Sequence, residues 1–136
     1  MTTKDWLNRA NGLQREIDEM KETYQRALEL ACKTVSVPSD VSVQESHQNG
    51  TERRLVDVAV FSEMISEKIS ERYKILAEIT AAIDRVEDTR LRTLLYARYI
   101  NRKTWEEVAE RLDMSDKWVR TSLHSQALQM IENSRG

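Results

Sequence analysis

Side chains that suit contacts to nucleic acid are concentrated near the C-terminus. Lys117 and Arg120 are cations, and Thr121 carries a hydroxyl group. Such cations bind phosphate oxygens, and Arg also pairs with the acceptor edge of guanine in the major groove. Asp116 can accept a hydrogen bond from cytosine, although stabilising a helix N-terminus is its simpler role. We predict that double-stranded DNA is contacted by Asp116, Lys117, Arg120, Thr121 and His124.

Two short helices are predicted to position these residues. Thr104 and Glu107 form a capping-box pattern, in which the Thr104 hydroxyl accepts from the Glu107 amide and the Glu107 carboxylate caps the Thr104 amide. A tight turn at 113–115 is followed by a second helix over about 116–131, with Ser115 as its N-cap. This arrangement is typical of a helix-turn-helix, which presents the start of its second helix to the major groove. The predicted motif core is Trp105, Val108, Ala109, Leu112, Val119 and Leu123. Packing against the first helix is the preferred position for Trp118, and the alternative is an exposed indole that contacts sugar-phosphate or a protein partner.

The remainder of the chain is also predicted to be helical. Apolar residues from Trp6 to Ala31 alternate in steps of four and three, which predicts an amphipathic helix. Pro38, Gly50 and the polar residues between them predict a flexible loop before a second long helix. Because so narrow an apolar stripe needs a partner helix, we expect an intrachain helical hairpin, with an intermolecular coiled coil as the alternative. The predicted organisation is a heptad helix at 1–34, a polar loop at 35–50, a second helix at 51–87 and a helix-turn-helix domain at 88–136.

The composition predicts an all-α fold. The chain has 136 residues, of which 32% are charged, with only 3 Gly and 1 Pro. Few helix breakers and many helix-forming residues favour helices over sheets. The single Cys32 cannot form an intramolecular disulfide, which favours a reducing compartment. No apolar run approaches the roughly 18–20 residues of a membrane span, and no signal-peptide core is present. We therefore expect a cytoplasmic protein without membrane contact.

Charge is unevenly distributed along a chain whose net charge is −2. Residues 1–88 hold twelve Lys and Arg against seventeen Asp and Glu, whereas residues 89–136 hold nine against six. This polarity favours an anionic partner for the C-terminal third. The two His, the single Cys and the scattered carboxylates show no spacing typical of a metal site or of a nucleophile with its base, and no Gly-rich phosphate loop occurs. We predict no catalytic residues, no metal and no cofactor, and therefore a protein that is not an enzyme.

The C-terminal motif resembles sigma factor region 4. The resemblance rests on residues 99–109 (YINRKTWEEVA), on Ser115, on Trp118-Val119 and on Ala127-Leu128. Within that group the chain is most similar to a family of small phage- and prophage-encoded proteins, and the similarity covers nearly the whole chain. Related phage proteins regulate late transcription, so the resemblance implies a transcription regulator in a bacterial host cell rather than a complete sigma factor. By motif position, it implies promoter contacts by Asp116, Lys117, Arg120 and Thr121.

The chain departs from the family pattern at two places. Asp113 stands at the turn position where Gly is frequent, and Asp tolerates left-handed backbone geometry better than most residues. The spacing from Val119 to Ala127 is one residue longer than in the family, and Ser122 stands where an apolar residue is expected. One additional residue turns everything that follows it by about 100° around a helix.

Three functions fit these features. The preferred one is a phage or prophage transcription regulator that binds DNA through helix 116–131, with the helical arm providing dimerisation or a contact to RNA polymerase. A dimer is favoured, because a motif with few cationic contacts binds DNA weakly as a monomer. The alternatives are a DNA-packaging recognition subunit similar to small terminases, and an RNA polymerase-binding sigma mimic without DNA affinity of its own.

Overall fold

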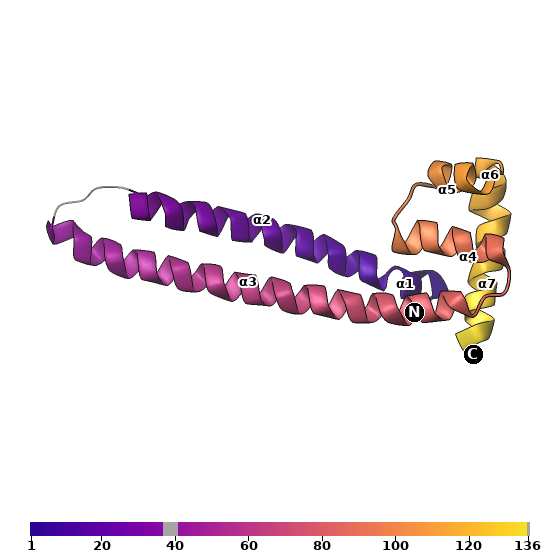
Figure 1. Cartoon of the computed structure of the whole chain (residues 1–136), viewed down its shortest axis with the longest axis horizontal. Coiled ribbons are helices and arrows are strands. Elements are labelled where there is room, and N and C mark those ends of the chain that lie inside the picture. Colours follow the sequence, from indigo (N-terminus) through magenta and orange to yellow (C-terminus); the bar gives the residue numbers. More distant parts are fainter. Residues whose placement is uncertain (37–40, 136) are drawn as a thin grey trace. The chain divides into compact units, whose positions relative to one another are not determined.

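The computed structural model describes residues 1–36 and 41–135, and within these ranges every regular element is a helix (Figure 1). The all-α fold and the long helical hairpin predicted from the sequence are confirmed. None of the described helices is both long and apolar enough to cross a membrane. The elements are α1 (Thr3–Leu7), α2 (Arg9–Ser36), α3 (Val41–Asp84), α4 (Thr89–Leu95), η1 (Tyr96–Ile100), α5 (Trp105–Leu112), α6 (Asp116–Trp118), η2 (Val119–Leu123) and α7 (His124–Arg135), where η denotes a π-helical turn.

The chain divides into two compact units, of which the second comprises Leu13–Glu71. This unit is a hairpin of α2 and α3, which run side by side in Figure 1. Leu13 and Ile17 of α2 and Ile65 of α3 are buried. Lys68 Nζ lies 3.9 Å from a carboxylate oxygen of Glu16, an ion pair that joins the two helices. Because both groups are partly solvated, this pair stabilises the hairpin far less than the buried apolar side chains do.

Several predicted boundaries of the arm are wrong. The predicted single helix over 1–34 is interrupted at Asn8, between α1 and α2. The predicted loop over 35–50 is helical up to Ser36 and again from Val41, so α3 begins ten residues before its predicted start. Loss of apolar periodicity does not by itself decide whether a backbone is helical, since residues with adequate helix propensity can form a helix without such a pattern. The rest of the predicted loop, residues 37–40, lies outside the described residues.

The first unit comprises Met1–Gly12 with Arg72–Gly136 and contains the larger core. Trp6 of α1 lies between two guanidinium groups, with Arg9 at 4.8 Å and Arg135 of α7 at 4.1 Å from its ring centroid. The contact with Arg135 attaches α1 to the end of α7. The buried side chains of this unit form one cluster, which consists of Trp6, Leu7, Ala10, Ile79, Ala82, Ile83, Val86, Leu91, Leu94, Leu95, Ala97, Tyr99, Val108, Ala109, Val119, Leu123, Ala127 and Ile131.

The connection between α3 and α4 is fixed by side chains that bind backbone groups. The Asp88 carboxylate accepts hydrogen bonds from the amides of Arg90 at 2.8 Å and Leu91 at 3.3 Å, so it is the N-cap of α4. Arg92 Nη1 donates to the carbonyls of Val86 at 2.6 Å and Glu87 at 3.0 Å. The cap and the guanidinium together satisfy backbone groups at both ends of this connection.

Candidate nucleic-acid interface

Helix α5 begins at the predicted cap. Thr104 Oγ1 accepts a hydrogen bond from the Glu107 amide at 3.2 Å, which confirms the first half of the capping box. The second half is wrong, because the Glu107 carboxylate accepts from the Thr104 hydroxyl at 3.1 Å instead of from its amide. The same carboxylate lies 3.8 Å from Lys103 Nζ. The ammonium group holds the carboxylate on this side of the helix.

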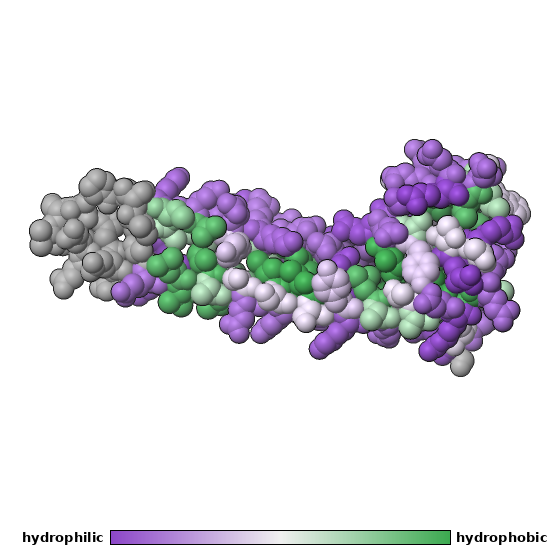
Figure 2. Space-filling model, in the orientation of Figure 1, coloured by the Kyte–Doolittle hydropathy of each residue, from purple (hydrophilic) through white to green (hydrophobic). Residues whose placement is uncertain are grey.

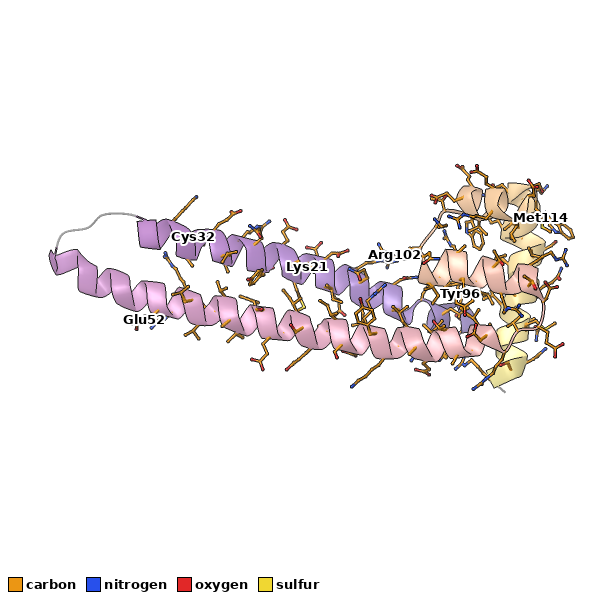
Figure 3. The ribbon with its side chains drawn as sticks, in the orientation of Figure 1. Lys21, Cys32, Glu52, Tyr96, Arg102 and Met114 are labelled. Carbon is orange, nitrogen blue, oxygen red and sulfur yellow. The ribbon has the colours of Figure 1, made fainter. Side chains whose placement is uncertain are left out.

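A tight turn joins α5 to α6. Asp113 has φ 58° and ψ 41°, the left-handed conformation expected for a residue in the position of a helix-terminal Gly. The amide of Met114, labelled in Figure 3, donates to the Ala109 carbonyl at 3.1 Å and closes the turn. Ser115 then accepts a hydrogen bond from the amide three residues later at 3.2 Å, as the predicted N-cap. Two helices with the predicted tight connection are therefore present.

The residues predicted to hold the two helices together do lie in the core. Val108, Ala109, Val119 and Leu123 are buried, whereas Trp105 and Leu112 are half-buried and pack against the same core. The small Ala109 side chain lets the second helix approach α5 closely. Arg98 lies over the Trp105 ring, with its guanidinium carbon 4.5 Å from the ring centroid. The motif therefore belongs to the core of the first unit.

The one-residue difference in spacing between Val119 and Ala127, which the resemblance implies, coincides with the π-helical turn η2. The His124 amide donates to the Val119 carbonyl, five residues earlier, where an α-helix would use a carbonyl four residues earlier. In a regular α-helix, His124 would lie about 140° around the axis from Val119. The wider turn removes most of the rotation added by the extra residue. Leu123 and His124 thus share the buried face with Val119 and Ala127.

The prediction that His124 contacts DNA is wrong for this reason. Its side chain is only 9% exposed, and its Nε2 lies 2.5 Å from the hydroxyl oxygen of Tyr99. Its ring also makes an edge contact with Trp105, at 4.5 Å between centroids. Burial, followed by the positive charges of Lys4 and Arg98, lowers the His124 pKa to about 4, and burial raises the Tyr99 pKa to about 12. Both rings are therefore neutral at pH 7, and the pair is a core hydrogen bond.

Three other predicted contact residues share an exposed face at the start of the second helix. Lys117, Arg120 and Thr121 are exposed there, and Asp116 is half-buried beside them. Arg120 Nη1 lies 3.5 Å from an Asp116 carboxylate oxygen one turn earlier. The Thr121 hydroxyl donates to the Lys117 carbonyl at 2.6 Å. With its proton so used, Thr121 can accept from a base amino group, whereas it cannot donate to a phosphate in this rotamer.

Trp118 was predicted to pack against α5, and this prediction is wrong. Its side chain is 49% exposed, next to Lys117 in the sequence. The backbone explains the exposure, because Val119 follows directly and occupies the buried position in the motif. An exposed indole adds an apolar surface, suited to stacking, beside the exposed Lys117, Arg120 and Thr121. We call the surface formed by these three residues and Trp118 the α6–η2 face.

Among the described residues, no group of three His, Cys, Asp or Glu side chains is placed to hold a metal ion. Cys32, labelled in Figure 3, is exposed on α2 in the other unit. What the α6–η2 face provides is positive charge, hydrogen-bonding groups and one aromatic surface.

Deletion of Ser122 is expected to change the free energy of unfolding by less than about 1 kcal/mol, although it lies inside a helix of the core. Without it, a regular α-helix would still direct Val119, Ala127 and Ile131 to one face. Insertion of one Ala after Ser122 should instead destabilise by more than about 2 kcal/mol, because it rotates Ala127 and Ile131 away from the core. Urea unfolding of the two variants tests this account of η2. Equal destabilisation by deletion and insertion would contradict it.

Comparison with known proteins gives one match. No curated protein and no solved structure matches the chain significantly. Residues 34–131, which include all of α3 and α5 and most of the second helix of the motif, match the family described as "Protein of unknown function (DUF1492)". Because this match covers most of the 136 residues, the chain belongs to the DUF1492 family.

Proposed function

We propose that this protein is a transcription regulator that binds double-stranded DNA by inserting the α6–η2 face into the major groove. The observation that carries the proposal is the exposure of Lys117, Arg120 and Thr121 together at the start of the second helix of a helix-turn-helix. The major groove admits one α-helix, and the N-terminal residues of such a helix reach the base edges. The resemblance to sigma factor region 4 supports a role in transcription, in a phage or prophage.

Each side chain of the face has a distinct proposed role. Arg120 binds guanine or a phosphate after it leaves Asp116, the carboxylate that it contacts at 3.5 Å. Lys117 binds a phosphate as a mobile point charge. Thr121 accepts from an adenine or cytosine amino group while its own proton stays on the Lys117 carbonyl. Trp118 contacts the sugar or a thymine methyl group at the edge of the groove.

Selection of bound fragments from a sheared host-plus-phage DNA library tests the proposal. The wild-type chain is compared at two salt concentrations with a Lys117→Ala/Arg120→Ala/Thr121→Ala variant, whose folding is checked by circular dichroism. We expect the wild type to enrich a discrete site and the variant to lose it. A site in a promoter supports regulation, whereas a site at a packaging origin supports the packaging alternative. If the wild type enriches nothing, the proposal is wrong, and RNA polymerase becomes the next partner to test.

A further inference from the structure

The second unit carries an apolar stripe on α3 that faces away from its hairpin partner. Val56 and Val60 are 60% and 48% exposed, and Met64 beside them is 44% exposed. Ile65, which is buried in the hairpin, lies on the opposite side of the same helix. Figure 3 shows the Glu52 side chain, one turn before Val56, on the side of α3 away from α2, and Figure 2 shows apolar surface along this hairpin.

The stripe has the spacing of a coiled-coil seam. Arg53, Val56, Val60, Glu63 and Glu67 follow one another in steps of three and four, so they share one face of α3. Each of these side chains is exposed. A seam with two valines at its centre, a cation before them and carboxylates after them is unusual for a solvated surface, where apolar residues are scattered singly.

We propose that this face pairs with the same face of a second copy of the chain, with the two α3 helices antiparallel. In this register Val56 packs against the partner's Val60, and Val60 against the partner's Val56. Arg53 then lies opposite the partner's Glu63, and the two-fold symmetry repeats the same ion pair at the other end. Ala59, a small exposed residue between the two valines, permits a close approach of the helices.

The charges along this face of α3 favour a second copy of the chain as the partner, in the antiparallel orientation. A parallel pair would place Arg53 against Arg53 and Glu63 against Glu63, which is repulsive. An anionic membrane surface or a nucleic acid would meet the carboxylates of Glu63 and Glu67 beside the valines. Only a partner that offers a carboxylate opposite Arg53 and a cation opposite Glu63 complements the seam, and a reversed copy of the seam itself does so. The residues from Arg53 to Glu63 span about 15 Å, so the dimer should be weak and concentration-dependent.

Charge reversal tests the proposal in sedimentation equilibrium experiments on the full chain without DNA, so its outcome does not depend on the proposed function. Arg53→Glu or Glu63→Arg alone replaces two attractive pairs by two repulsive ones and should weaken dimerisation about tenfold or more. The double variant Arg53→Glu/Glu63→Arg restores both pairs with reversed sign and should dimerise within about threefold of the wild type. Lys21→Glu, on an exposed position of α2, is the control for charge and should leave dimerisation unchanged.

Two outcomes would overturn the inference. One is a wild-type chain that stays monomeric at a few hundred micromolar. Even a weak dimer that pairs through a short helical seam should form by roughly this concentration. The other is a double variant as weak as the single variants, since only antiparallel pairing of this face predicts their mutual rescue. Because all the substituted residues are exposed, circular dichroism should show unchanged helix content in every variant, which separates loss of pairing from loss of folding.

Discussion

Lowering the pH from 7 to 4 is expected to reduce the free energy of unfolding by up to about 3 kcal/mol through His124 alone. In the unfolded chain the imidazole has a pKa near 6.5, whereas burial and the nearby Lys4 and Arg98 lower it to about 4 in the folded chain. Between these values the unfolded state binds a proton that the folded state excludes. The stabilisation is therefore complete above pH 6.5 and is lost progressively as the pH falls towards 4.

Urea unfolding of the wild type and of His124→Phe at pH 7, 5.5 and 4.5 measures this effect. Phe retains an aromatic ring against Trp105 but cannot titrate, and it leaves the Tyr99 hydroxyl without its partner. The variant should be less stable than the wild type at pH 7, and the difference should shrink as the pH falls. Carboxylates titrate in both proteins and cancel in the comparison. A difference that stays constant from pH 7 to 4.5 would show that His124 is not held neutral in the core.

Replacement of Arg120 by Ala is expected to reduce affinity for the selected DNA site by about 1–3 kcal/mol, which is roughly 5- to 150-fold, and to relax the preference at one base pair. The wild-type Arg120 must leave its ion pair with Asp116 before it binds DNA, and this cost reduces the net affinity that Arg120 contributes. If the cost is large, the loss of affinity in the variant falls in the lower part of the range. Lys117→Ala should weaken all sequences about equally and reduce the slope of log K against log salt by about one.

Fluorescence anisotropy titrations at several salt concentrations separate these two effects. The control is Lys21→Ala, which removes one positive charge from an exposed position on α2 in the other unit. Its affinity for the selected site should equal that of the wild type. If Lys21→Ala weakens binding as much as Arg120→Ala does, binding depends on overall charge, and the α6–η2 face has no special role.

Local signals in the sequence predicted the motif well. The caps at Thr104 and Ser115, the left-handed turn at Asp113 and the apolar positions around Ala109 each depend on residues a few positions apart. Such short-range preferences can be read without knowledge of the fold. The exposed cations followed from the same pattern, because a helix with one buried stripe exposes the remaining positions.

What could not be predicted depends on distant contacts. The extra residue near Ser122 was visible in the sequence, but its position in η2 is decided by whether Leu123 and His124 find partners in the core. One partner is Tyr99, twenty-five residues away and next to a second π-helical turn, η1. The early start of α3 escaped detection because residues 41–50 lack a regular apolar pattern, which is the main sequence signal for a helix.

Binding of double-stranded DNA by the α6–η2 face can be tested by NMR titration of the isotopically labelled chain with a short duplex that carries the selected site. We expect the largest shift changes on the amides of residues 115–122 and on the indole N–H of Trp118. Amides around Lys21 on α2, in the other unit, should hardly change. Shift changes that leave residues 115–122 unaffected while the duplex is bound elsewhere, or a spectrum that does not change at all, would contradict the account.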